Sequence, residues 1–138
     1  MSEIWSKVNR QIPAYLKRYR QIAVVGLSAD PTRPSYKVAE YLLYQGFTVF
    51  PVNPKYEEIL GQTSYKSLLD IPGKIEIVNI FRKANYVEPI VDEAIQKETK
   101  LIWMQLGVIN EQAAQTALEA GVDVVMDRCI RVEHAALR

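Results

Sequence analysis

IAVVGLSADPTRPSY, at residues 22–36, is a continuous apolar run that ends in a glycine and a polar loop. The run is short and rich in β-branched residues, which predicts a strand covered on both faces. A second strand is predicted at residues 47–52, and a helical pattern at residues 35–45 separates the two. The chain therefore contains a strand–loop–helix–strand unit. Such a unit places the N–H groups of a helix N-terminus at the carboxyl edge of a parallel sheet, where anions bind.

The rest of the chain continues this alternation. Further strands are predicted at residues 75–81, 101–106 and 122–126, and further helices at residues 87–97, 110–120 and 130–137. Strands that alternate with helices pair in parallel through right-handed crossovers. The expected fold is α/β: a three-layer Rossmann-like fold with a five-stranded parallel sheet in the order 3-2-1-4-5.

The remaining segments fit a single domain over residues 1–138. Residues 1–20 are predicted as an N-terminal helical extension, in which Pro13 either ends one helix or begins a second turn. Ser35 is expected as the N-cap of the helix at residues 35–45, and Gly46 as its stop.

Composition excludes several classes of protein. The 138 residues include 17 basic and 16 acidic ones, so the chain has no overall charge that would suit nucleic acid. Its single cysteine, Cys129, excludes an intramolecular disulfide and fits a reducing compartment. Neither a secretory signal nor an apolar run long enough to span a membrane is visible. We expect a soluble cytoplasmic protein.

The loops at the carboxyl edge indicate the kind of ligand. A dinucleotide site would carry G-x-G-x-x-G after the first strand and an acidic residue after the second. This chain has Gly26 alone and then Asn53-Pro54-Lys55, without a carboxylate. Basic residues stand instead at the ends of three strands: Arg33, Lys55 and Arg82. Alternatively, Gly26 only allows a tight turn and each cation is solvated, but the three together favour a ligand with several phosphates.

Several segments resemble the small single-domain CoA-binding proteins of bacteria and archaea. In order along the chain, the matching segments are IAVVGLS (22–28), SY (35–36), VNPK (52–55), IFR (80–82), WMQLG (103–107) and VMDRC with EH (125–134). The resemblance implies a Rossmann-like fold similar to the N-terminal CoA-binding domain of the succinyl-CoA synthetase α subunit. The phosphorylated histidine of that enzyme lies in a second domain, so the ligase reaction is not carried over.

The resemblance also implies roles at the first two loops. Gly26 and Ser28 would approach the CoA pyrophosphate at the N-terminus of the first helix of the alternating unit. Arg33, Ser35 and Tyr36 would border it.

The loops after the second and third strands would complete the site. Asn53, Pro54 and Lys55 would meet the adenosine and its 3′-phosphate. Phe81 and Arg82 would line the opposite wall.

The resulting hypothesis is a protein that binds coenzyme A or an acyl-CoA as a non-catalytic carrier, sensor or accessory module, with a protein partner left open. One alternative is a small enzyme that uses Cys129 for acyl or disulfide exchange with the CoA thiol, and His134 lies five residues further on. The other is a regulatory module for a different nucleotide. Gln105 is a further candidate contact for pantetheine. One histidine and one cysteine are too few for a zinc site.

Overall fold

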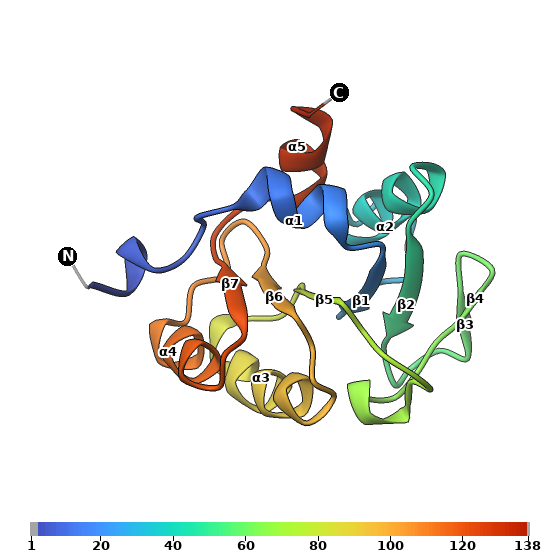
Figure 1. The fold of residues 1–138 in the computed structure, drawn as a ribbon. Coiled ribbons are helices and arrows are strands. Elements are labelled where there is room, and N and C mark those ends of the chain that lie inside the picture. Colours follow the sequence, from blue (N-terminus) through green and yellow to red (C-terminus); the bar gives the residue numbers. More distant parts are fainter. Residues whose placement is uncertain (1–2, 138) are drawn as a thin grey trace.

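The computed structural model describes residues 3–137 and has a five-stranded sheet covered by helices on both faces (Figure 1). Its strands are β1 (Gln21–Val25), β2 (Thr48–Val52), β5 (Ile77–Ile80), β6 (Leu101–Met104) and β7 (Asp123–Val125). All neighbouring strands in this sheet pair in parallel. The predicted fold class, a Rossmann-like α/β fold with a five-stranded parallel sheet, is confirmed.

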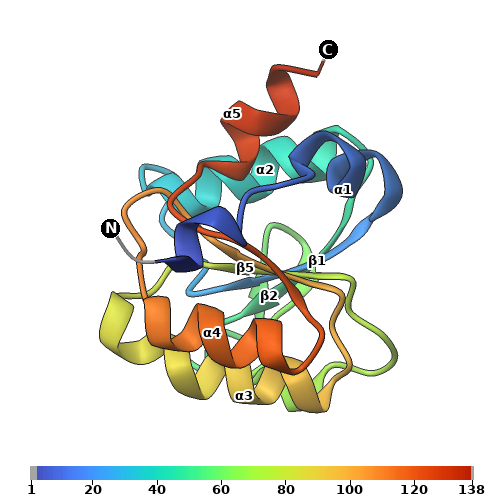
Figure 2. The same cartoon turned by 60° about the vertical axis from the view of Figure 1, so that its left-hand side comes forward.

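Helices form the two outer layers. The α-helices are α1 (Ile12–Arg18), α2 (Pro34–Tyr44), α3 (Val87–Gln96), α4 (Glu111–Glu119) and α5 (Ile130–Ala135). Short 3-10 turns are η1 (Glu3–Ser6), η2 (Leu68–Asp70) and η3 (Ala84–Tyr86), and β3 (Glu58–Ile59) pairs antiparallel with β4 (Gln62–Thr63). Figure 2 shows α1, α2 and α5 on one side of the sheet and α3 and α4 on the other.

The order of the strands differs from the prediction. The sheet runs β2-β1-β5-β6-β7, which is 2-1-3-4-5 when its strands are numbered along the chain, so the predicted order 3-2-1-4-5 is wrong. Between β2 and β5, Leu68 and Ile71 of the crossover pack into the same apolar cluster as α3. The helix α2 connects β1 to β2 on the opposite face of the sheet. Right-handed crossovers on opposite faces advance in opposite directions, so the connection from β2 to β5 must lead back across the sheet. The chain therefore returns past β1, and β5 pairs with the free edge of β1.

The N-terminal segment covers the edge of β7. Pro13 stands in the first turn of α1, so it begins a helix, and the residues before it form only a 3-10 turn. Asn9, with a positive φ of 58°, separates the two. Its backbone N–H donates to Val124 O (3.0 Å), and its side chain exchanges hydrogen bonds with the backbone N–H and C=O of Met126. These bonds satisfy part of an edge that would otherwise be open to another strand.

Helix ends follow the predictions in part. Gly46 lies after the C-cap of α2 with φ 93°, as expected of a helix stop. The N-cap of α2 is Arg33 rather than Ser35, and it makes no side-chain capping bond. Ser35 is buried inside the first turn, where its hydroxyl oxygen accepts a hydrogen bond from Ser28 N–H in the preceding loop.

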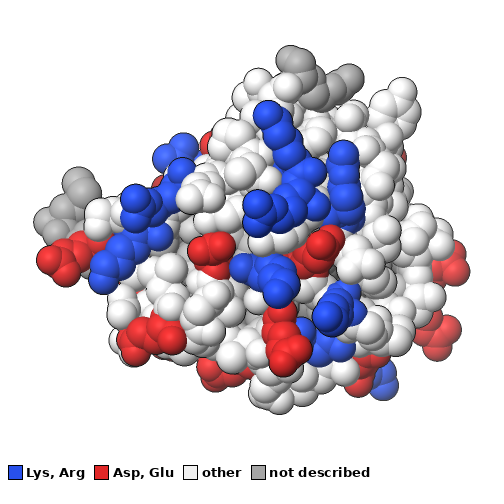
Figure 3. All heavy atoms as spheres, in the orientation of Figure 1, with Lys and Arg blue, Asp and Glu red and all other residues white. Residues whose placement is uncertain are grey.

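Two further features of the molecule are the distribution of its surface charges and the length of its helices. On the face seen in Figure 3, basic and acidic side chains are interspersed, with a group of basic ones over the region of α1. Within residues 3–137, no helix is long and apolar enough to cross a membrane.

Candidate functional site

A small crevice lies where the order of the strands reverses, between the carboxyl ends of β1 and β5. In open parallel sheets this position is the usual ligand site. The cavity has a volume of about 340 Å³ and is lined by Gly26, Ser28, Arg33, Pro34, Ser35 and Phe81. Five of the ten predicted contact residues therefore meet in one cavity. The corrected order of the strands is what brings Phe81 next to Gly26.

Gly26 allows the ends of β1 and β5 to approach each other. Its φ is 86°, and a Cβ placed on it would lie 2.3 Å from the carbonyl oxygen of Phe81. Its own N–H donates to Val52 O at 3.0 Å, which ties the loop to β2 as well. The glycine is thus required by the protein backbone itself, whether or not a phosphate also lies close to it.

The loop from Ser28 to Ser35 is held by its own polar side chains. Ser28 N–H donates to Ser35 Oγ (3.0 Å), and Asp30 N–H donates to Ser28 Oγ (3.0 Å). Both the N–H and the hydroxyl of Thr32 donate to Asp30 Oδ1, at 2.9 and 2.7 Å. These two bonds, with a smaller effect from Arg33, hold the pKa of Asp30 below its usual value. The loop is therefore ordered in advance at the mouth of the crevice.

Asn53 connects the loop after β2 to the loop after β1. Its Nδ2 donates to Leu27 O at 2.9 Å, and its Oδ1 accepts from Lys55 N–H at 3.0 Å. Both ends of the Asn53 amide are thus engaged within the protein, so the side chain positions the loop. Pro54 and Lys55 remain exposed beyond it.

Of the three predicted cations, Arg33 lines the crevice, and Lys55 and Arg82 are not among its lining residues. Arg33, Lys55 and Arg82 are all exposed. The Arg82 guanidinium lies over the ring of Tyr86, 4.5 Å from its centroid, and its stem packs near Gly26. The Arg82 guanidinium is therefore both stacked on a ring and exposed, so its charge is available to a phosphate.

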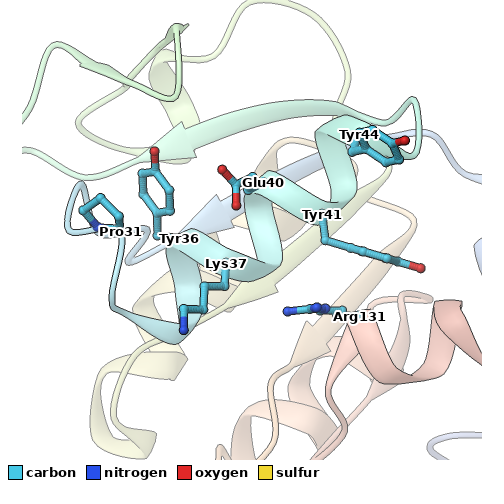
Figure 4. A pocket seen from close by; sticks show the side chains of 7 residues that line it. All are labelled: Pro31, Tyr36, Lys37, Glu40, Tyr41, Tyr44 and Arg131. Carbon is cyan, nitrogen blue, oxygen red and sulfur yellow. The ribbon is translucent and has the colours of Figure 1, made fainter.

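Tyr36 is turned to the other side of α2. It lines a cavity of about 730 Å³ together with Pro31, Lys37, Glu40, Tyr41, Tyr44 and Arg131 (Figure 4). This larger cavity lies along the outer surface of α2 and is separate from the residues of the crevice. The structure therefore brings Gly26, Ser28, Arg33, Ser35 and Phe81 together but leaves Tyr36 outside.

Cys129 and His134 lie at opposite ends of α5. Cys129 is the N-cap of this helix and is half-buried. His134 Nδ1 is 2.8 Å from the Tyr41 hydroxyl, and its ring packs edge-on against Tyr41 and Phe47. The histidine thus anchors α5 to α2. Acyl or disulfide exchange through Cys129 stays a prediction.

Asn79 is a buried polar residue that the sequence analysis did not single out. It lies within β5, is fully buried, and donates from Nδ2 to Gln105 Oε1 at 3.2 Å. The available signal was an amide inside the apolar run IVNI of a predicted strand. Among the described residues, no group of three or more His, Cys, Asp or Glu side chains could hold a metal ion.

Known proteins resemble this chain in sequence and in fold. The sequence matches the family described as "CoA binding domain" over residues 20–135. An uncharacterized protein of Bacillus subtilis, YneT, is 39% identical over 93% of this chain and 95% of its own length. A hypothetical protein from Pyrococcus horikoshii has the same fold, with a TM-score of 0.89 and 46% identity over 91% of this chain and 89% of that one.

A larger relative carries the same domain as part of an enzyme. The acetate–CoA ligase (ADP-forming) II subunit alpha of Pyrococcus furiosus is 38% identical over 89% of this chain. The chain spans only 30% of the length of that subunit. What the two share is therefore one domain of the subunit.

Proposed function

The chain belongs to the CoA binding domain family, and from that premise we propose that it binds coenzyme A, or an acyl-CoA, at the carboxyl edge of β1, β2 and β5. The observation that carries the proposal is the crevice at the reversal point of the sheet, where loops from β1 and β5 meet around Gly26. In this proposal the protein is a binding module that carries, senses or presents CoA and does not itself catalyse a reaction.

The donors around the crevice suit a pyrophosphate. The first N–H groups of a helix have no intrahelical acceptor, and the N-cap Arg33 offers none from its side chain. These groups and the helix dipole favour an anion at the start of α2. Arg33 lines the crevice, and a guanidinium can donate two parallel hydrogen bonds to a phosphate.

The loop after β2 suits the 3′-phosphate and the adenosine. Asn53 holds this loop against the β1 loop, and the exposed Lys55 belongs to the same loop. No carboxylate stands at this position to accept hydrogen bonds from a ribose diol, so a nicotinamide dinucleotide is disfavoured. Phe81 supplies an apolar wall of the crevice, and the exposed Arg82 follows it in the chain.

Titration calorimetry with a series of ligands tests the proposal. CoA should bind more tightly than dephospho-CoA, and both more tightly than NAD or AMP, because each step removes a phosphate or the pantetheine arm. NAD binding more tightly than CoA would overturn the proposal. Native mass spectrometry of protein purified from its source supplies an independent test, since a retained ligand is identified by its mass.

Lys55 provides the sharpest variant for this site. Lys55→Ala should weaken CoA binding by about 1.5–3 kcal/mol, the range for a hydrogen bond to a charged group, and the loss should shrink as salt rises. Lys74→Ala is the matched control, because Lys74 is also exposed but lies before β5, at the amino edge of the sheet. Equal effects of the two variants would show that only the overall charge matters.

A further inference from the structure

We infer that Gln105 and Asn79 form an amide-recognising subsite beside the crevice, built to bind the amide-containing pantetheine arm of the ligand; this inference rests on the proposed CoA binding. Asn79 lies on β5 and Gln105 directly follows β6, and both are on the face of the sheet that α2 and α5 cover. Gln105 would contact the ligand, and Asn79 would be a positioning residue that acts through Gln105.

Gln105 continues β6 beyond its last residue. Its backbone N–H donates to Ile80 O at 3.3 Å, and its side chain is only 6% exposed. Phe81, which lines the crevice, follows Ile80 directly. Adjacent strands lie about 5 Å apart, so the end of β6 is about 10 Å from the end of β1. An arm attached to a pyrophosphate at the β1 loop can cross β5 and reach Gln105.

Two donors determine the orientation of the Gln105 amide. Its Oε1 accepts from the backbone N–H of Ile130 at 3.4 Å and from Asn79 Nδ2 at 3.2 Å. A backbone N–H can only donate, so the oxygen of the amide must face Ile130. The Nε2 group therefore points elsewhere.

The Nε2 group is the part of Gln105 that is left for a ligand. Among the described residues it makes no hydrogen bond, and it is not one of their buried unpartnered polar atoms, so it reaches solvent. A fixed NH₂ group at the carboxyl edge of the sheet is a donor for a carbonyl oxygen. Pantetheine carries two amide carbonyls, and neither adenine nor the phosphates offers a neutral carbonyl.

Asn79 supports Gln105 from inside the sheet, at a cost to stability. It pairs with Val24 on one side and Trp103 on the other, and it is fully buried. Its Oδ1 has no hydrogen-bond partner among the described residues. An apolar residue would avoid that unpaired oxygen, so the position is better explained by what Asn79 Nδ2 does for Gln105.

The test compares two ligands on each variant. CoA carries the pantetheine arm, and adenosine 3′,5′-bisphosphate has the same nucleotide end without it. Gln105→Met should weaken CoA binding roughly 3- to 10-fold, as expected for one lost neutral hydrogen bond, and should leave binding of the bisphosphate within about twofold. Gln112→Met is the matched control, because Gln112 is exposed on α4 on the other face.

Asn79→Leu provides a second test, because a residue with a structural role alone would not change the ratio of the two affinities. It should lower the ratio of CoA affinity to bisphosphate affinity in the same direction as Gln105→Met, whereas general damage to the fold would weaken both ligands equally. An unchanged ratio in Gln105→Met, with CoA still bound, overturns the subsite and leaves the proposed function intact. If the wild-type protein binds neither ligand, the proposed function itself fails and the subsite falls with it.

Discussion

The two faces of the sheet are built differently. On the face covered by α3 and α4, the buried strand side chains are apolar, and the helices contribute valines and alanines. The face covered by α1, α2 and α5 also has an apolar cluster, but polar groups interrupt it. Asn79 and Gln105 are buried on this face, and Trp103 Nε1 donates to Arg128 O at 2.9 Å.

The difference indicates which face of the sheet has a role beyond stabilising the fold. Buried polar groups cost free energy unless they are paired, and each pairing fixes a loop or a helix in one position. Trp103 holds the loop before α5, and Tyr41 holds the end of α5 through His134. The α3/α4 face contributes stability, and the α2/α5 face additionally positions the segments around the crevice.

Gly26 directly follows β1 at the carboxyl edge that the two faces share, and its substitution should have the largest effect. Gly26→Ala places a Cβ against the Phe81 carbonyl, so the ends of β1 and β5 must separate. We expect more than about 4 kcal/mol of lost stability or failure to fold, with CoA binding lost as a consequence. Urea unfolding followed by circular dichroism measures this.

Gly46→Ala is the control for Gly26→Ala. Gly46 also has a positive φ, but nothing lies within 4 Å of a Cβ added there. Its cost should stay near the 1–2 kcal/mol of a left-handed backbone. Similar costs for the two variants would mean that backbone conformation, and not the approach of β5, explains the glycine.

Ile102 tests the apolar face. Ile102→Ala removes a fully buried side chain from β6 on the α3/α4 side, and it should cost about 2–5 kcal/mol through lost burial and a cavity. Binding of CoA by the folded fraction should not change. Ile109→Ala, at a half-exposed position, should cost far less in the same urea titration. A loss below about 1 kcal/mol at Ile102 would show that this face repacks freely.

Trp103 is the next residue of β6 and tests the opposite face. Trp103→Phe keeps an aromatic ring but leaves Arg128 O without its donor, so we expect a cost of about 1–3 kcal/mol. Unlike Ile102→Ala, it should also increase amide hydrogen exchange in α5. Trp5→Phe, at a half-buried position of η1, is the control. Unchanged exchange in α5 would contradict the proposed role of the indole N–H.

The sequence predicted the elements of both faces but not how they connect. Apolar periodicity identified every strand of the main sheet and the helices α2 to α5, because burial imposes these patterns. The start of α1 was left open, and the residues before it form only a 3-10 turn. Periodicity does not report which face a short crossover uses, and the packing of Leu68 and Ile71 beside α3 decided the order of the strands. Gly26 and Phe81, both predicted contacts, line one cavity, whereas Tyr36 lines the cavity beside α2. Their contact with CoA stays a prediction.

Alkaline pH should produce the smallest of these effects, on the face that carries polar groups. Burial, and then the charge of Asp123, raises the pKa of Tyr15 to about 12, from 10.0. The folded protein therefore holds this proton more tightly than the unfolded chain does, so the contribution to stability is complete below pH 10. It is lost as the pH rises from 10 through about 12.

The Tyr15→Phe variant tests that titration directly. The variant has no hydroxyl to titrate, so its stability should fall less steeply between pH 10 and 12 than that of the wild type. Tyr44→Phe, at a position that is 86% exposed, should follow the wild-type curve. Both slopes come from urea unfolding at a series of pH values. If the Phe variant at position 15 keeps the wild-type slope, the loss of stability at alkaline pH arises from other groups and not from the Tyr15 hydroxyl.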